Sequence, residues 1–333
     1  MDQSTPGQID KNLYQLKIEL PRNPLKVLNS YVMTSEDRNL VVDTGFNLPE
    51  CLASLRQGLE ALDLDLSRTD FLATHLHADH TGLISTVMSP TSRVYMGRVD
   101  KALFERTTTG LGGFWQAAEL RFAREGYSQR ELDETRRMNP ARNFASSYVP
   151  GILPLDEGDT VAVGDMRWTV VETPGHTPGH ICLYEPSKKF LLTGDHLLFD
   201  ITPNITCWEG VTDSLGDYLE SLRKIRRYDA VQVLPAHRGI EGSLQKRVDE
   251  LLVHHANRLE DVLRIVRTHP HSTGYDIASH MPWSIRAASW ADFPPGQRWF
   301  AVGEAIAHIE HLVLGGKLLR EERNGVNTYE VAE

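Results

Sequence analysis

The chain has 333 residues, of which 41% are hydrophobic and 24% charged, as is ordinary for a soluble globular protein with a large and a small domain. Its net charge of −10 argues against unspecific nucleic-acid binding, and no apolar run approaches the ~18 residues of a membrane span. The first residues lack the basic start and apolar core of a signal peptide, and three scattered cysteines form no disulfide framework. We therefore expect a cytoplasmic protein without membrane contact.

The first hundred residues alternate between strands and helices. Strands are predicted at 14–20, 27–34 and 39–42, with a polar turn at 35–38. A helix is predicted over 49–62 from four leucines at helical spacing, Leu52, Leu55, Leu59 and Leu62. Strand–helix units continue over 71–80, 81–88 and 93–96.

Residues 101–150 break this alternation and read as a helical insertion with a glycine hinge at 110–113. The insertion is rich in aromatic residues and carries seven arginines, Arg106, Arg121, Arg124, Arg130, Arg136, Arg137 and Arg142. Two interpretations stay open. The insertion is either a lid that offers an apolar wall and a cationic rim to an anionic substrate, or a packed helical excursion with a solvated basic face.

The second half of the large domain is richer in strands. They are predicted at 160–163, 166–172, 180–184, 190–193 and 231–234, with a helix over 214–228 before the last one. Two mixed sheets with helices outside predict an α/β fold, an αββα sandwich, for a domain that spans residues 1–243.

Residues 244–333 form the predicted second domain. Three helices at 244–267, 274–280 and 298–314, followed by a hairpin, resemble a winged-helix module. This part has 10 Lys and Arg residues against 12 Asp and Glu residues, a balance that disfavours DNA binding. The helix and aromatic pattern favours a structural or dimerising cap, so a homodimer stays open.

The most informative stretch, Thr74 to Gly82, places three imidazoles and a carboxylate directly after an apolar strand. These four residues are His75, His77, Asp79 and His80. Zn²⁺ and related divalent metals favour imidazole nitrogen and carboxylate oxygen, and a loop after a strand can aim such groups into one cleft. Later loops that also follow strands supply His176, Asp195 and His237.

Histidine distribution supports this interpretation. Of the 14 histidines, the seven before residue 244 all lie in these motif segments. Two of them, His180 and His196, lie beside the candidate ligands and are expected to be packed or to contact the ligands rather than a metal.

These segments, in this order, resemble the metallo-β-lactamase superfamily, whose dinuclear members carry His-x-His-x-Asp-His, then a His, an Asp and a final His. The resemblance runs from about residue 27 to residue 237 and implies a metallo-β-lactamase sandwich with two divalent metal ions. It implies one metal held by His75, His77 and His176, a second held by Asp79, His80 and His237, and Asp195 as the bridge. The donor set suits Zn²⁺ first, and also Fe²⁺ or Mn²⁺.

The resemblance implies a hydrolase. Two metals ~3.5–4 Å apart share a hydroxide and lower the pKa of water towards ~7, and Asp79 would orient that nucleophile. The leading hypothesis is hydrolysis of a small-molecule or carrier-linked acyl thioester, as in glyoxalase II-like hydroxyacyl-thiol hydrolases or acyl-carrier thioesterases. A lactonase, a short metal-dependent ribonuclease or phosphodiesterase, and a metal-dependent sensor are the alternatives. The 41 residues between Asp195 and His237 are too few for the inserted domain of RNA-processing members.

Overall fold

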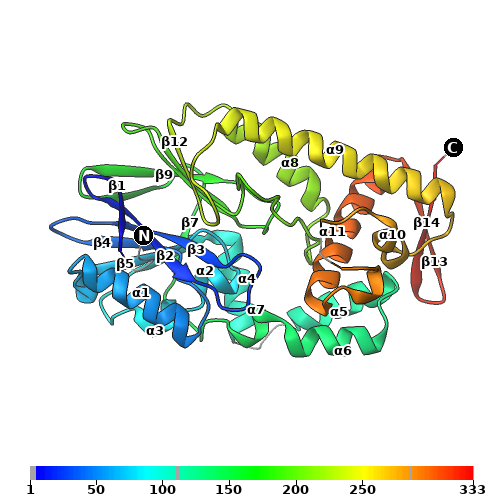
Figure 1. Ribbon diagram of the computed structural model, residues 1–333, viewed down its shortest axis with the longest axis horizontal. Helices are drawn as coiled ribbons and strands as arrows, with labels where there is room; N and C mark the ends of the chain where they lie inside the picture. The colour runs from blue at the N-terminus through cyan, green and yellow to red at the C-terminus, as the bar shows by residue number, and fades with distance from the viewer. Residues whose placement is uncertain (1–4, 110–112, 285–286, 333) are drawn as a thin grey trace.

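The computed structural model describes residues 5–109, 113–284 and 287–332, and it confirms the expected sandwich of two sheets with helices outside (Figure 1). The first sheet has seven strands in chain order. They are β1 (Gly7–Asp10), β2 (Leu13–Glu19), β3 (Val27–Met33), β4 (Asn39–Val42), β5 (Thr69–Ala73), β6 (Val94–Gly97) and β7 (Leu153–Leu155). The sequence pattern does not predict the two edge strands β1 and β7, which have only four and three residues.

The second sheet has five strands in the order β12-β11-β10-β9-β8. They are β8 (Thr160–Val163), β9 (Met166–Glu172), β10 (Ile181–Glu185), β11 (Phe190–Gly194) and β12 (Gln232–Pro235). Only β11 and β12 run parallel, and both end towards the same edge. Tyr31 and Leu72 from the first sheet meet Trp168 and Leu183 from the second in one buried apolar cluster.

Helices cover both outer faces. On the first sheet lie α1 (Pro49–Ala61), α2 (Ala78–Thr81) and α3 (Ile84–Val87), and the apolar stripe of α1 buries Leu55 and Leu59 there. On the second sheet lie α8 (Ser214–Ile225) and the first turns of α9 (Leu244–Thr268), where Leu222 and Val248 share a cluster. Because α9 is continuous, it runs from the sandwich into the C-terminal residues (Figure 1).

The insertion consists of α4 (Arg98–Thr108), α5 (Phe114–Arg124), α6 (Gln129–Met138) and α7 (Pro140–Asn143). Of the expected hinge, residues 110–112 lie outside the described part, and Gly113 adopts a positive φ of 59° directly before α5. Ser128 and Glu131 form a capping box that begins α6.

The C-terminal residues form α10 (Gly274–His280), α11 (Pro295–Leu314) and a hairpin of β13 (Leu318–Arg323) and β14 (Val326–Val331). The helices and hairpin agree with the predicted elements, whereas the winged-helix description stays a prediction. Figure 1 shows α5 and α6 beside α10, α11 and the hairpin, at one end of the molecule.

The insertion shares a hydrophobic core with the C-terminal helices. Phe122, Tyr127 and Leu132 belong to the same buried cluster as Val262 and Ile306. The ring of Phe122 stacks on that of Trp299, with centroids 3.5 Å apart. The α5–α6 part of the insertion is therefore anchored on the C-terminal helices.

A buried carboxylate reinforces this contact. Glu125, at the end of α5, is 1% exposed and accepts hydrogen bonds from the Tyr329 hydroxyl at 2.9 Å and from Asn327 Nδ2 at 2.6 Å. Its carbonyl oxygen accepts the Tyr275 N–H at 2.8 Å. Burial raises the pKa of Glu125, while the two side-chain donors act in the opposite direction. Removal of Tyr329 would leave Oε2 of this buried acid without its side-chain donor.

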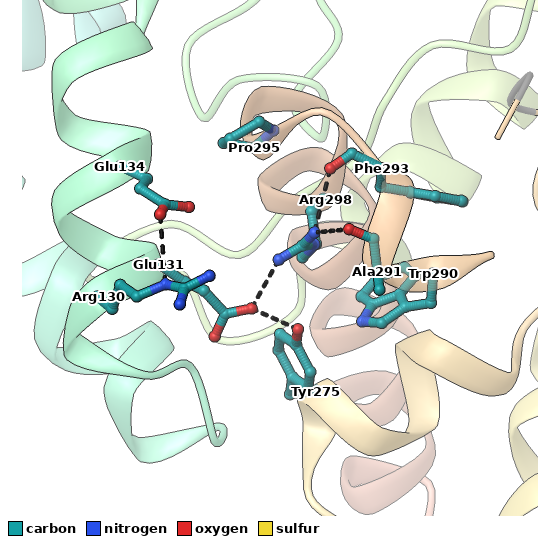
Figure 2. A pocket seen from close by; sticks show the side chains of 9 residues that line it. All are labelled: Arg130, Glu131, Glu134, Tyr275, Trp290, Ala291, Phe293, Pro295 and Arg298. Carbon is teal, nitrogen blue, oxygen red and sulfur yellow. Dashed lines mark hydrogen bonds and ion pairs between the residues drawn. The ribbon is translucent and has the colours of Figure 1, made fainter. Parts of the chain in front are cut away.

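Figure 2 shows the other joint between α6 and the C-terminal residues. Glu131 accepts a 2.5 Å hydrogen bond from the Tyr275 hydroxyl and pairs with Arg298 at 2.7 Å. A pocket of about 450 Å³ opens here. Both arginines that line the pocket already pair with carboxylates: Arg298 with Glu131, and Arg130 with Glu134 at 3.3 Å. An anionic ligand would have to break these ion pairs, so we do not assign this pocket as the catalytic site.

The shared core predicts that the insertion and the C-terminal helices lose structure together. Ile306 is fully buried on α11, so Ile306→Ala should cost about 2–5 kcal/mol and leave a cavity. Hydrogen exchange followed by mass spectrometry should show faster exchange in α6, far away in sequence. Leu55→Ala, in the core under α1, is the control and should leave α6 exchange unchanged. Unchanged α6 exchange in Ile306→Ala would contradict a common core.

Candidate active site

The first motif begins in the loop after β5, which carries His75 and His77, and continues into α2, which carries Asp79 and His80. The strand ends at Ala73, and Thr74 then fastens the loop on both sides. Its N–H donates to Asp43 Oδ1 at 2.9 Å, and its carbonyl accepts the Ile181 N–H at 3.0 Å. The following residues thus enter the edge between the two sheets, where His75 and His80 are fully buried.

The other three predicted residues arrive at the same edge from the second sheet. His176 lies in the loop between β9 and β10, Asp195 follows β11, and His237 follows β12. Gly194 has a positive φ of 49°, and a Cβ there would lie 2.7 Å from His180 Nε2, so glycine permits the close turn into Asp195. The structure therefore brings all seven predicted residues together.

Three imidazole nitrogens converge in a first cluster. His77 Nδ1 lies 3.0 Å from His75 Nε2 and 3.0 Å from His176 Nε2. Two nitrogens that bind one Zn²⁺ at about 2.0–2.1 Å in a tetrahedral arrangement lie roughly 3.3 Å apart. The spacing and the exclusively imidazole donor set fit a divalent cation.

A second cluster contains Asp79, His80 and His237, whose donor atoms lie within 4.8 Å of one another. Asp79 Oδ2 is 3.9 Å from His80 Nε2 and 3.5 Å from His237 Nε2. Both nitrogens are buried, and neither has a hydrogen-bond partner among the described residues. Orphaned buried nitrogens beside a carboxylate are the arrangement that a bound cation would satisfy.

Asp195 lies between the two clusters. Its Oδ2 is 3.7 Å from His176 Nε2, whereas its Oδ1 is 3.7 Å from His80 Nε2 and 3.5 Å from His237 Nε2. One carboxylate thus presents one oxygen to each group of imidazoles.

The opposite ring nitrogens are held by contacts outside the clusters. His80 Nδ1 lies 2.8 Å from Asp43 Oδ2, and His75 Nδ1 lies 3.1 Å from Thr74 Oγ1. His176 Nδ1 donates to the carbonyl of Asn204 at 2.8 Å, and His237 Nδ1 donates to that of Val27 at 2.9 Å. Such contacts fix ring orientation and leave the other nitrogen available as a ligand.

The electrostatics differ between the clusters. Burial and neighbouring imidazoles lower the pKa of His77 to about 3, and burial lowers that of His176 to about 4, so both keep a free lone pair at neutral pH. Burial also opposes the charge on His80, but Asp43, Asp79 and Asp195 outweigh it and raise its pKa to about 10. A cation at the second cluster would displace this proton, as metal binding to imidazole commonly does.

The two histidines beside the predicted ligands stay outside the clusters. His180 Nε2 accepts the backbone N–H of Asp195 at 3.2 Å, and its Nδ1 contacts Thr173 Oγ1 at 2.8 Å. His196 is fully buried, and its ring packs against Tyr218. His180 therefore orients the backbone of Asp195.

Sequence reasoning missed the roles of two buried carboxylates. Asp43 holds Thr74 and His80, and its only signal is its position in an Asp-Thr-Gly turn after a strand. Asp100, in α4, accepts the Leu76 N–H at 2.8 Å, the Thr177 hydroxyl at 2.6 Å and the Gly179 N–H at 2.6 Å. It ties the first motif loop to the His176 loop, and no sequence pattern marks it.

An aromatic wall borders the first cluster. Trp208 stacks beside His77 with ring centroids 5.9 Å apart, and Phe114 of α5 lies 6.1 Å from Trp208. Trp115 lies under the guanidinium of Arg142, 4.7 Å from its ring centre. Five of the seven arginines of the insertion pair with carboxylates of the chain: Arg106, Arg121, Arg130, Arg136 and Arg142. The wall is therefore mainly apolar beside His77.

Comparison with known proteins agrees with the geometry. The sequence model of the Metallo-beta-lactamase superfamily matches residues 25–237, and that of the Metallo-beta-lactamase-like, C-terminal domain matches 292–332. A crystal structure of a metallo-beta-lactamase family protein from Thermus thermophilus has a TM-score of 0.83 and 27% identity, covering 97% of this chain and 100% of that one.

Two relatives extend the comparison. The human Acyl-coenzyme A thioesterase MBLAC2 is 28% identical over 223 residues, 63% of this chain and 72% of that protein. A Beta-lactamase-like protein 2 homolog from Caenorhabditis elegans is 24% identical over 271 residues, 80% of this chain and 75% of that protein.

The two-sheet sandwich and the clustered donors fit a metal-dependent hydrolase, and the family model and the thioesterase relative support a hydrolase. The chain belongs to the metallo-β-lactamase superfamily, as the sequence resemblance predicted, and membership implies divalent metal binding. Within the described ranges, no helix combines the length and apolarity needed to cross a bilayer.

The role of Asp100 can be tested. All three of its partners donate, so Asp100→Asn would turn an amide NH₂ towards a donor in a fully buried place. We expect a loss of about 1–3 kcal/mol in the free energy of unfolding, measured with denaturant. The control is Asp156→Asn. It removes an exposed ion pair with Arg98, which lies on α4 like Asp100, and it should change the free energy of unfolding little. Equal effects of the two substitutions would refute the role of Asp100 in joining the two loops.

Proposed function

We propose that this chain is a dinuclear metal-dependent hydrolase of acyl thioesters. The observation that carries the proposal is the position of Asp195 between two groups of imidazoles, with one oxygen towards each. A single-metal site would leave the second set of buried donors without a role.

The assignment of ligands follows the two clusters. His75, His77 and His176 would hold one ion, Asp79, His80 and His237 the other, and Asp195 would bridge. Zn²⁺ suits this donor set, as do Fe²⁺ and Mn²⁺. When bound, such ions lower the pKa of water and polarise the scissile carbonyl.

The remaining chemistry belongs to the chain itself. Asp79 keeps its carboxylate ionised, because the attraction of His80 and His237 outweighs burial and lowers its pKa. It can therefore accept a hydrogen bond from the attacking water and orient it towards the carbonyl carbon. His180 contacts Asp195 only at the backbone N–H and offers no ligand atom to either cluster.

The wall beside His77 supports an acyl substrate. Trp208 and Phe114 offer apolar surface next to the first cluster, where an acyl chain would lie. The human relative is named as an acyl-coenzyme A thioesterase, which favours a thioester over other acyl compounds. Whether the thiol belongs to a small molecule or to a carrier, the reacting group is the same.

The domain division, the location and the oligomeric state expected from the sequence also belong to the proposal. A division into domains at 243/244, a cytoplasmic location and a homodimer through the C-terminal residues remain predictions. Helix α9 begins directly after the proposed division and packs Leu244 and Val248 in the cluster of α8. We therefore expect a fragment that ends at residue 243 to be less soluble than the whole chain.

The substrate class is testable with a panel. Purified chain loaded with Zn²⁺ should hydrolyse acyl thioesters with a kcat/KM well above that for lactones and phosphodiesters, measured under the same conditions. Preference for a lactone or a phosphodiester would refute the thioester assignment and leave the metal assignment intact.

The bridge predicts a specific metal defect. Asp195→Asn should lower the metal content below two ions per chain and reduce turnover by orders of magnitude, because both clusters lose a charged donor. Elemental analysis after dialysis measures the content. His180→Ala is the matched control, since its ring contacts Asp195 only through the backbone, and it should retain both ions. Two ions and full turnover in Asp195→Asn would show that Asp195 does not bridge.

A further inference from the structure

Residues 204–208, between β11 and α8, make two polar contacts with His176. The carbonyl of Asn204 accepts the His176 Nδ1–H at 2.8 Å, and Trp208 Nε1 donates to the carbonyl of His176 at 3.2 Å. The Trp208 ring also stacks beside His77. Both the imidazole and the backbone of His176 are thus held by this segment.

The same segment is attached to α11 on its other side. Asn204 Nδ2 donates to the carbonyl of Phe300 at 3.2 Å and to Glu304 Oε2 at 3.3 Å. Gly303 packs against Thr206 so closely that a Cβ would lie 2.4 Å from the Thr206 hydroxyl oxygen. The contact therefore depends on the absence of a side chain at position 303.

A buried ion pair stabilises the α11 side of this connection. Arg258 Nε, from α9, lies 3.2 Å from Glu304 Oε1, and the two side chains are 7% and 12% exposed. Arg258 also donates to the carbonyl of Pro282 at 2.6 Å, and its guanidinium lies 4.0 Å from the ring centre of Trp283. Because Arg258 is held in three ways, Glu304 has little freedom to move away from Asn204.

We propose that Asn204, Trp208 and Glu304 are positioning residues for His176, through which the C-terminal helices control the first metal cluster. The inference rests on the proposed function, in which His176 binds a metal. The carbonyl that accepts from His176 Nδ1 is held by the side chain of its own residue, and that side chain is held by α11. Loss of this anchorage lets the carbonyl move, and the imidazole then rotates away from His75 and His77.

The test measures metal affinity directly. Asn204→Ala keeps the carbonyl but removes its attachment to α11, and Trp208→Phe keeps an aromatic ring but removes the donor to His176. In competition with a chromophoric chelator, each variant should bind one of two Zn²⁺ ions about 10–100-fold more weakly and the other as the parent does. With Co²⁺ in place of Zn²⁺, the visible absorption bands should change, which reports a changed coordination.

A matched control separates positioning from general destabilisation. Val262→Ala removes apolar volume from the core around α11, and its side chain has no polar atom, so it takes no part in the hydrogen-bond chain. It should lower Tm at least as much as Asn204→Ala while leaving both Zn²⁺ affinities and the Co²⁺ spectrum unchanged.

The outcomes are distinguishable. Parent affinity and spectrum in both Asn204→Ala and Trp208→Phe would overturn the inference, as would an equal affinity loss in Val262→Ala. A parent chain that binds no divalent metal would instead overturn the proposed function on which the inference rests. Weaker binding of one ion in both variants, with the control unchanged, would establish the positioning role.

Discussion

The structure depends on the confinement of five imidazoles and two carboxylates at one buried edge of the sandwich. Burial of polar atoms without partners is unfavourable, and among the described residues His80 Nε2, His237 Nε2 and Asp195 Oδ1 have none. The chain offsets part of this cost by giving the opposite ring nitrogen of four histidines a fixed contact. What is left unsatisfied lies at the second cluster, beside Asp79 and Asp195. The unfavourable part of the arrangement is thus concentrated where a cation would relieve it.

Charge is distributed unevenly over this edge, and the reason is geometric. His80 lies among Asp43, Asp79 and Asp195, whereas His77 and His176 mainly face other imidazoles and apolar surroundings. The first cluster is consequently neutral and the second contains more carboxylate. The second cluster also contains Asp79, the carboxylate that would orient the attacking water in the proposed function.

Local pattern predicted most strands of both sheets, the outer helices and the donor-rich segments that follow apolar strands. The choice of the seven residues within those segments came from the resemblance to the superfamily. The edge strands β1 and β7 were missed, since short edge strands bury little and carry weak periodicity. Asp100 and Asn204 were also missed. Their contacts join segments that are 24 to 100 residues apart, and no local spacing can signal such a contact.

The insertion also makes contacts with distant segments that the local sequence pattern could not predict. Its arginines suggested a cationic rim, yet five of them pair with carboxylates of the chain, and two of those, Glu209 and Glu310, lie outside the insertion. Its aromatic residues divide between two tasks. Phe122 joins the core around α11, while Phe114 reaches Trp208 beside the first cluster.

Trp208 in turn belongs to the segment that α11 holds through Asn204 and Gly303. The apolar wall and the His176 loop therefore share one support, and that support is the C-terminal helix. A change in α11 that shifts this support would displace the apolar wall and the first imidazole cluster together. On the proposed function, a substitution in α11 that reshapes the wall would therefore also disturb metal binding, whereas a substitution of Phe114 would change the wall alone.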